Sequence, residues 1–446
     1  MLAVKKRSPL RTLCLFLALS LLTSLKFFSL YSNARDSEAY VDSMISAGTI
    51  GLEIPGSFGL VLLESDGVVY DGVEGGNQAD SALYIAYHPQ DFDAGNVQVN
   101  LIRLQQLGLQ GQFAYLLGSL CRAVHAPARA AYFLYRWANA ILLSATLLAI
   151  ALQLRKAYDE LFALVFFAVS VLSTWVTEFA ANLYWIEFSW FLPMLFGLMA
   201  LNHPRKRGWF YLLAALSVAL KSACGYEYIT TVMLGSVVFL AAKWLAAAIR
   251  KAPDALRLFR SLLGVGFASL FGFAFTLLLH AYLRCNGDVY AGIVDIIYCD
   301  VLRRTVGDPV VSSGGTSVTV PVSVLSVLVR YWLLSVTGLL ATGSLLANLV
   351  LLARRKDRRA ALCDLVLLVL GALASSSWYI LAKSHSYIHH HLNGVLFYLP
   401  FMQISVYLLL KQLIGRRLAR CAGEERERLA ARFLDRLGQI TADAGE

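Results

Sequence analysis

Two acidic residues follow the first apolar stretch of the chain and could do acid–base chemistry. Asp36 and Glu38 stand in the segment Arg35-Asp36-Ser37-Glu38. A carboxylate held at the depth of lipid phosphates could act as a general base. Carboxylates also stabilise the N-terminus of a helix, so the same pair could instead begin the next helix. Both interpretations stay open from the sequence.

A short apolar hairpin carries three more polar side chains. Glu178 and Asn182 are four residues apart, which places them on one face of a helix, and Glu187 follows after an aromatic segment. The hairpin offers these side chains little solvated surface. We therefore predict that these side chains line a cavity, with Glu178 as a candidate catalytic residue and Asn182 and Glu187 as acceptor-binding or wall residues.

The next polar turn pairs a lysine with a glutamate. Lys221 lies inside an apolar run, and Glu227 follows it by six residues. The two could form a buried structural ion pair, or Lys221 could bind phosphate beside a catalytic or structural Glu227. Tyr226, next to Glu227, is assigned to the wall of the same cavity.

Basic residues and histidines close the set of candidates, namely Arg303, Arg304, Lys383, His385 and His389. Arginine and lysine bind phosphate through charge-assisted hydrogen bonds. His385 and His389 have the i,i+4 spacing of a metal-binding helix face. Because no acidic motif accompanies them, we favour hydrogen bonds to phosphate or to a sugar hydroxyl, and a structural polar turn is the alternative.

No cofactor is predicted with certainty, and a divalent metal stays open.

Composition restricts the elements that position these residues. Of the 446 residues, 58% are hydrophobic and 15% are charged. A soluble fold of this length would have too few polar residues to cover its surface. The sequence lacks the alternating ten-residue strands of a membrane barrel and has no Walker-type phosphate loop. We therefore predict an all-α polytopic membrane protein that is not an ATP-driven pump.

Apolar stretches bounded by charge predict ten membrane spans. They lie at residues 10–30, 131–154, 161–181, 188–202, 209–223, 229–247, 261–283, 329–352, 361–382 and 395–413. The first is interpreted as a retained anchor. Residues 1–413 form a single membrane domain with large outer loops at 31–129 and 284–328, and residues 414–446 form a charged tail.

Basic residues set the predicted orientation. The formal net charge is +10, and most of the 39 Lys and Arg residues fall in alternate turns. Because cytoplasmic loops are enriched in Lys and Arg, both termini are predicted to be cytoplasmic. The positive balance is a topology signal, so nucleic acid is not an expected partner. A bacterial inner membrane is the expected location. Cys285 and Cys299 share an outer loop. They could form a disulfide there or stay as two free thiols.

The layout resembles the GT-C superfamily of membrane glycosyltransferases, which use polyprenyl-phosphate-linked sugars. One span leads to a long outer loop that opens with acidic residues, and a basic, histidine-containing turn precedes the last span. Interfacial helices are expected in that loop at 91–107 and 110–124. Family members often have adjacent acidic residues, whereas Ser37 separates Asp36 from Glu38 here. Either acid could therefore be the base.

The resemblance implies transfer of a sugar from a polyprenyl-phosphate donor to a hydroxyl of a glycan, lipid or protein on the extracytoplasmic side. Asp36 would remove the acceptor proton, and the lipid phosphate would leave with inversion at the anomeric carbon. The implied phosphate ligands are Lys221, Arg303, Arg304, Lys383 and His385. Metal dependence varies within the superfamily.

Three other functions remain open from the sequence. An O-antigen or polysaccharide polymerase or ligase would also use outer-loop arginine and histidine. A flippase or transporter of lipid-linked sugars would need ionisable residues near the bilayer midplane, whereas here they lie at the outer ends of the spans. A non-catalytic assembly subunit is the third alternative.

Overall fold

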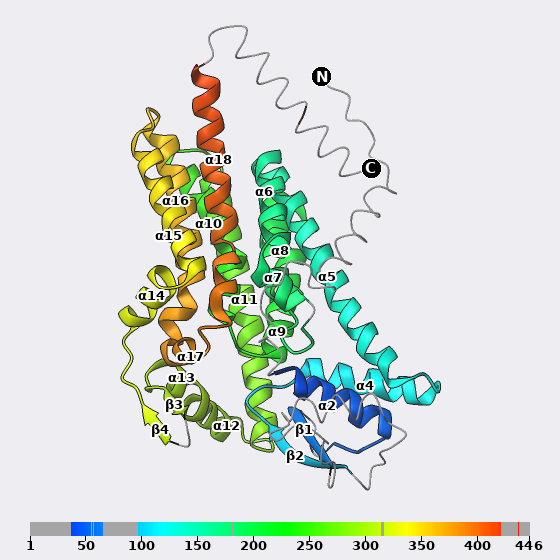
Figure 1. Ribbon diagram of the computed structural model, residues 1–446. Coiled ribbons are helices and arrows are strands. Elements are labelled where there is room, and N and C mark those ends of the chain that lie inside the picture. The colour runs from blue at the N-terminus through cyan, green and yellow to red at the C-terminus, as the bar shows by residue number, and fades with distance from the viewer. Residues whose placement is uncertain are drawn as a thin grey trace.

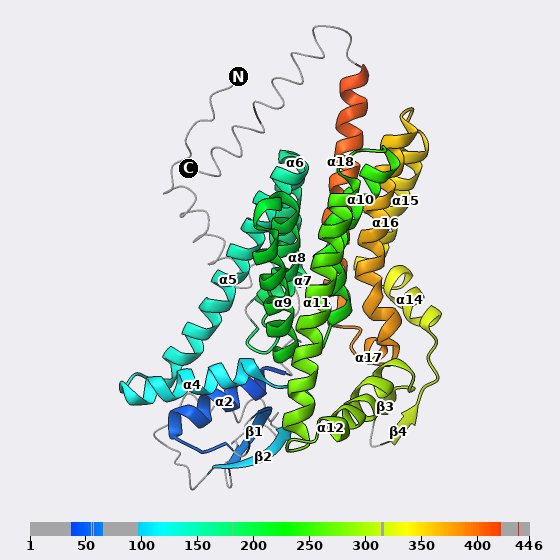
Figure 2. The same cartoon turned by 180° about the vertical axis from the view of Figure 1, so that it is seen from behind.

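The fold is a bundle of apolar helices that run alternately up and down (Figures 1 and 2). The computed structural model describes residues 37–54, 56, 58–65, 97–180, 182–313, 316–420 and 436. Within this part, five helices are long and apolar enough to cross a membrane: α5 (Ala128–Ala157), α10 (Ile229–Ile249), α11 (Ala255–Arg284), α15 (Val336–Ala353) and α16 (Arg358–Leu381). A bent pair, α6 (Glu160–Val171) and α7 (Thr174–Ala180), makes a sixth if it is one span. The protein is thus α-helical with five or six candidate spans in its described part.

The predicted number of ten spans is not confirmed. Span 10–30 lies outside the described residues, as does most of the tail 414–446. The other predicted spans all contain helix, but several of these helices are shorter or less apolar than a helix that crosses a membrane. They are α8 (Phe188–Asn202), α9 (Arg207–Cys224), which follows the turn η3 (Pro204–Lys206), α14 (Val324–Leu333), and α18 (Phe401–Arg420), which follows η5 (Asn393–Tyr398).

Serine side chains interrupt two predicted spans. Span 161–181 bends by 65° between α6 and α7, where Ser173 Oγ accepts a hydrogen bond from Val176 N at 3.2 Å. Span 329–352 is split into α14 and α15, because Ser335 Oγ accepts from Gly338 N at 2.9 Å and so begins a new helix. A serine that caps a helix gives the backbone an alternative to continuing the previous one.

A unit of two helices and a hairpin covers one end of the bundle. It comprises α2 (Glu38–Ile50), β1 (Leu60–Ser65), β2 (Val97–Arg103) and α4 (Leu109–Ala123), with β1 and β2 antiparallel. The predicted helix 110–124 is confirmed as α4, which exposes Phe113, Leu116 and Leu120, and its interfacial location stays a prediction. The predicted helix 91–107 is wrong over its second half, because the alternating apolar and polar residues from Val97 pair as a strand.

Short elements of the second polar loop, and one short helix that follows α16, lie at the same end (Figure 1). They are α12 (Val289–Asp295), the π-helical stretch η4 (Ile296–Leu302), α13 (Arg303–Thr305), the hairpin β3 (Val310–Ser313) with β4 (Thr316–Thr319), and α17 (Lys383–Ile388). Arg284, at the end of α11, contacts Asp295 and Asp300, each at 2.5 Å. These two ion pairs hold α12 and η4 against α11.

The two ends of the bundle differ in charge. We call the end that carries α2, α4, α12 and α17 the site end. The opposite end, called the basic end, holds the turns α5–α6, α8–α9, α10–α11 and α15–α16 (Figures 1 and 2). These are the turns in which the sequence concentrates Lys and Arg. The basic turns therefore share one end, as the orientation argument requires; that this end is cytoplasmic stays a prediction.

Close packing of α11 against α9 depends on a glycine. A Cβ on Gly272 would lie 2.1 Å from the carbonyl oxygen of Ala215, whereas a Cβ on Gly266 in the same helix would meet nothing within 4 Å. Small residues let membrane helices approach closely. We expect Gly272→Ala to destabilise the protein by about 1–3 kcal/mol, the usual cost of overpacking. Thermal unfolding in detergent measures this loss of stability. The control is Gly266→Ala, whose melting temperature should equal or exceed that of the wild type. Equal losses of stability in the two variants would contradict the role of Gly272 in packing.

Candidate functional site

A buried carboxylate lies in the turn between α9 and α10. Glu227 is 4% exposed. Gly225, two residues earlier, has a φ of 151°, and a Cβ there would lie 2.5 Å from Oε2 of Glu227 and 2.7 Å from Oε1 of Gln106. Only glycine fits such a backbone against two side chains. The turn is anchored by Tyr228, whose hydroxyl donates to Asn393 Oδ1 at 2.8 Å.

Positive side chains from three elements surround Glu227. Burial alone would raise the pKa of its carboxyl, but the charges of Arg304, Lys221 and Arg103 outweigh burial and lower the pKa to about 2. None of the ion pairs within 4.0 Å among the described residues joins these cations to Glu227. The cations therefore act on the carboxylate from beyond ion-pair distance.

Each cation is held in a different way. Lys221 Nζ donates to the carbonyl oxygen of Gly225 at 2.5 Å. The Arg103 guanidinium lies 5.1 Å from the centre of the Tyr40 ring and 5.4 Å from that of Tyr184, distances typical of cation–π contacts. Arg304 Nε is buried and has no hydrogen-bond partner in the described part of the chain. An orphaned buried donor on a cation is the feature expected where an anionic ligand binds.

The hairpin 182–187 supports Arg103 through Tyr184. Asn182 Oδ1 accepts hydrogen bonds from Tyr184 N at 2.8 Å and Trp185 N at 3.0 Å, which closes the turn. Glu38 Oε1 accepts from Leu183 N at 3.1 Å and so joins α2 to the hairpin. Two of the predicted site residues, Glu38 and Asn182, thus position the aromatic ring beside Arg103.

The two other predicted acids of this region are buried. Glu178 lies within α7. Glu187 lies just before α8, and neither of its carboxylate oxygens has a hydrogen-bond partner among the described residues. Burial raises the pKa of Glu187. Glu187 therefore resists ionisation, in contrast to Glu227.

The predicted histidine pair lies next to the cations. The ring centres of His385 and His389 are 4.4 Å apart, and Trp378 packs edge-on against His385 at 5.8 Å. Burial, with the charges of His389 and Arg304, lowers the pKa of His385 to about 3, so its imidazole is neutral at pH 7. Across the described residues, no group of three or more His, Cys, Asp or Glu is placed to hold a metal ion.

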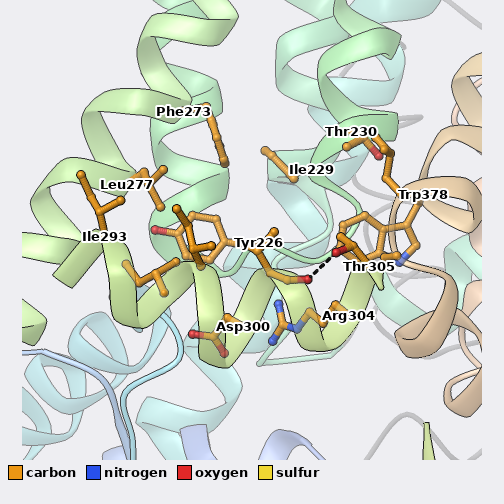
Figure 3. A pocket seen from close by; sticks show the side chains of 15 residues that line it. Tyr226, Ile229, Thr230, Phe273, Leu277, Ile293, Asp300, Arg304, Thr305 and Trp378 are labelled. Atoms are coloured by element: carbon orange, nitrogen blue, oxygen red, sulfur yellow. Dashed lines mark hydrogen bonds between the residues drawn. The ribbon is translucent and has the colours of Figure 1, made fainter. Parts of the chain in front are cut away.

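An apolar cavity of about 220 Å³ opens beside Arg304 (Figure 3). Its walls come from α10, α11, η4 and α16, and include Ile229, Phe273 and Leu277. In Figure 3 the apolar side chains gather above Asp300 and Arg304. Tyr226 lines the cavity too, and its hydroxyl lies 3.2 Å from Nδ1 of His280. The cavity thus combines a hydrocarbon wall with Arg304 and with Asp300, whose charge is paired with Arg284.

The remaining predicted site residues are not among the side chains that act on Glu227. Asp36 lies outside the described residues. Arg303 is exposed on α13, although it neighbours Arg304. Lys383 Nζ contacts Asp308 Oδ1 at 3.3 Å and donates to the carbonyl oxygen of Val322 at 2.7 Å. Its ammonium group therefore stabilises the loop before α14. The two outer-loop cysteines, Cys285 and Cys299, are free thiols and do not form a disulfide.

Sequence reasoning missed the residues contributed by β2 and the loop after it. Arg103 ends β2, and Gln106 Oε1 accepts a hydrogen bond from the Tyr184 hydroxyl at 3.4 Å. The available signal was the two-residue periodicity that ends at Arg103, which identifies a strand and places the arginine at its tip.

Compared with known protein families, with curated proteins and with solved structures, the chain shows no match.

Proposed function

We propose that this protein is a membrane glycosyltransferase that takes a sugar from a polyprenyl-phosphate-linked donor and transfers it to a hydroxyl of a glycan, lipid or protein. The observation that carries the proposal is the apolar cavity with Arg304 at its edge, because Arg304 also acts on the buried carboxylate of Glu227 together with Lys221 and Arg103. A lipid phosphate needs both features at once, because its chain requires a hydrocarbon wall and its headgroup requires cations. The resemblance in layout to the GT-C superfamily supports the same substrate class.

The reaction in this proposal is a single displacement. The acceptor oxygen forms a bond to the anomeric carbon while the bond from that carbon to the phosphate oxygen breaks. The acceptor proton goes to a carboxylate base, and the lipid phosphate leaves with the electron pair. Arg304, Lys221 and Arg103 would stabilise the charge that develops on the phosphate. The site would lie on the extracytoplasmic side of a bacterial inner membrane.

Two acids take different roles in this mechanism. A carboxylate with a pKa of about 2 is a weak base at neutral pH, so Glu227 serves as the counter-charge that keeps three cations together. Glu38 already accepts a hydrogen bond from Leu183 N in the turn 182–187. Asp36, two positions before Glu38, is therefore the proposed general base.

Binding of a short polyprenyl phosphate tests the phosphate site. We expect Arg304→Gln to weaken the binding of farnesyl phosphate to the detergent-solubilised protein about 10- to 100-fold, the usual effect of losing a charge-assisted hydrogen bond. Arg303→Gln is the matched control, since it removes the same charge from an exposed neighbour. Farnesol, which lacks the phosphate, should bind the wild type and both variants alike. Equal weakening by the two substitutions would contradict a specific role for Arg304.

A further inference from the structure

A second cavity lies at the basic end of the bundle, at the other end of α10 from Glu227. Helix α10 has 21 residues and is therefore roughly 30 Å long. The cavity has a volume of about 280 Å³ and lies between α10, the start of α11, α16 and α18. Its charged lining residues are Lys243, Arg250, Asp254, Asp364 and Lys411. It is separate from the site proposed for sugar transfer.

The carboxylates of this cavity already have cationic partners. Asp364 contacts Arg355 at 2.6 Å and Lys411 at 2.9 Å. Asp254 contacts Arg257 at 3.3 Å. By contrast, no carboxylate of the described chain lies within 4.0 Å of the charged nitrogens of Lys243 or Arg250. The cavity therefore has an excess of positive charge.

Two further groups in the wall could donate hydrogen bonds to an anion. Lys243 Nζ lies 3.9 Å from the centre of the Tyr158 ring, and the Tyr158 hydroxyl is buried without a hydrogen-bond partner among the described residues. Helix α11 begins at the wall after Asp254, whose side chain does not cap it. The first amides of a helix are free donors and carry a partial positive charge.

We propose that this cavity binds a phosphate group. Lys243 and Arg250 would contact its oxygens, the Tyr158 hydroxyl would donate to it, and the N-terminus of α11 would face it. The phosphate could belong to a phospholipid headgroup in the adjoining leaflet or to a soluble phosphate. Basic pockets between membrane helices at the cytoplasmic side are a known form of lipid headgroup site, which agrees with the predicted orientation.

Thermal unfolding of the full-length protein in detergent tests the proposal with three probes: inorganic phosphate, short-chain phosphatidylglycerol and short-chain phosphatidylcholine. We expect phosphatidylglycerol, phosphate or both to raise the melting temperature at lower concentration than phosphatidylcholine. Lys243→Gln and Arg250→Gln should each raise the half-saturating concentration at least fivefold. Tyr158→Phe should raise it about tenfold or more, because the lost hydrogen bond would have a charged phosphate oxygen as its acceptor. Arg359→Gln is the matched control, because Arg359 is exposed at the same end and does not line the cavity.

The outcomes separate the two sources of phosphate. A response to phosphatidylglycerol alone supports a lipid headgroup, and a response to inorganic phosphate supports a soluble ligand. If neither probe stabilises the protein, or if Arg359→Gln weakens the response as much as Lys243→Gln does, the cavity is not a phosphate site. Gel filtration shows whether each variant is folded, and Arg250, which is exposed, can be replaced without disturbing the core.

Discussion

Glu227→Gln is expected to lower the stability of the protein by about 3 kcal/mol at pH 7. A pKa lowered from 4.5 to about 2 corresponds to that free energy, because one pKa unit is worth about 1.4 kcal/mol. The physical cause is the group of Arg304, Lys221 and Arg103, which would repel one another without the carboxylate. Thermal unfolding in detergent measures the loss.

The pH dependence of this effect has a definite sign. Because the pKa of Glu227 is lower in the folded protein, its contribution is complete above pH 4.5 and is lost as the pH falls from 4.5 towards 2. Stability curves of wild type and Glu227→Gln should therefore converge in that acid range. A constant difference across it would show that the substitution acts through packing.

Glu187→Gln is the matched control and has the opposite expected sign. Burial raises the pKa of Glu187, so ionisation of this residue opposes folding above its ordinary pKa. Replacing it with the neutral isostere should leave stability at pH 7 unchanged or raise it. If both substitutions destabilise the protein equally, the cations do not account for the behaviour of Glu227.

Asp36→Asn is expected to lower sugar transfer by about 10²- to 10⁴-fold, the contribution usual for general base catalysis. The assay is consumption of polyprenyl-phosphate-linked hexoses and pentoses by native membranes that contain the protein and supply the acceptor. Because Asn keeps the shape of Asp, melting temperature and binding of farnesyl phosphate should stay within the range of wild type.

Glu38→Gln distinguishes a base from a positioning residue. Glu38 holds Leu183 N of the hairpin, so its substitution should lower stability together with transfer. Asp36→Asn should lower transfer alone. Full activity of Asp36→Asn would remove Asp36 from the mechanism and leave Glu38 as the next candidate for the base.

Local sequence patterns determined the class of the protein and the placement of its ends. Long apolar stretches form helix because no water is available in a membrane to satisfy the backbone. The alternation of basic turns then put Lys and Arg at one end and the candidate residues at the other. Both patterns are visible in windows of about 20 residues, so they could be read without a structure.

The membership of the site depended on contacts between distant segments. Lys221, Arg304 and His385 are candidates by residue type, but their common effect on the Glu227 carboxylate depends on how α9, α13 and α17 are placed around the turn that carries it. Arg103 was missed because it ends a strand that forms only when paired with β1. Lys383 has the right chemistry for phosphate, yet Asp308 holds it elsewhere.

Hydrophobicity and charge are properties of each segment, and they predicted the helical class and the basic end from the sequence alone. Where the helices break and which segment pairs as a strand became visible only in the structure. Which cation meets which carboxylate is a property of packing, because two side chains interact only where the backbone brings them within a few ångströms. Tertiary structure therefore decided that Glu227 has cations around it, and that Glu38 supports the hairpin.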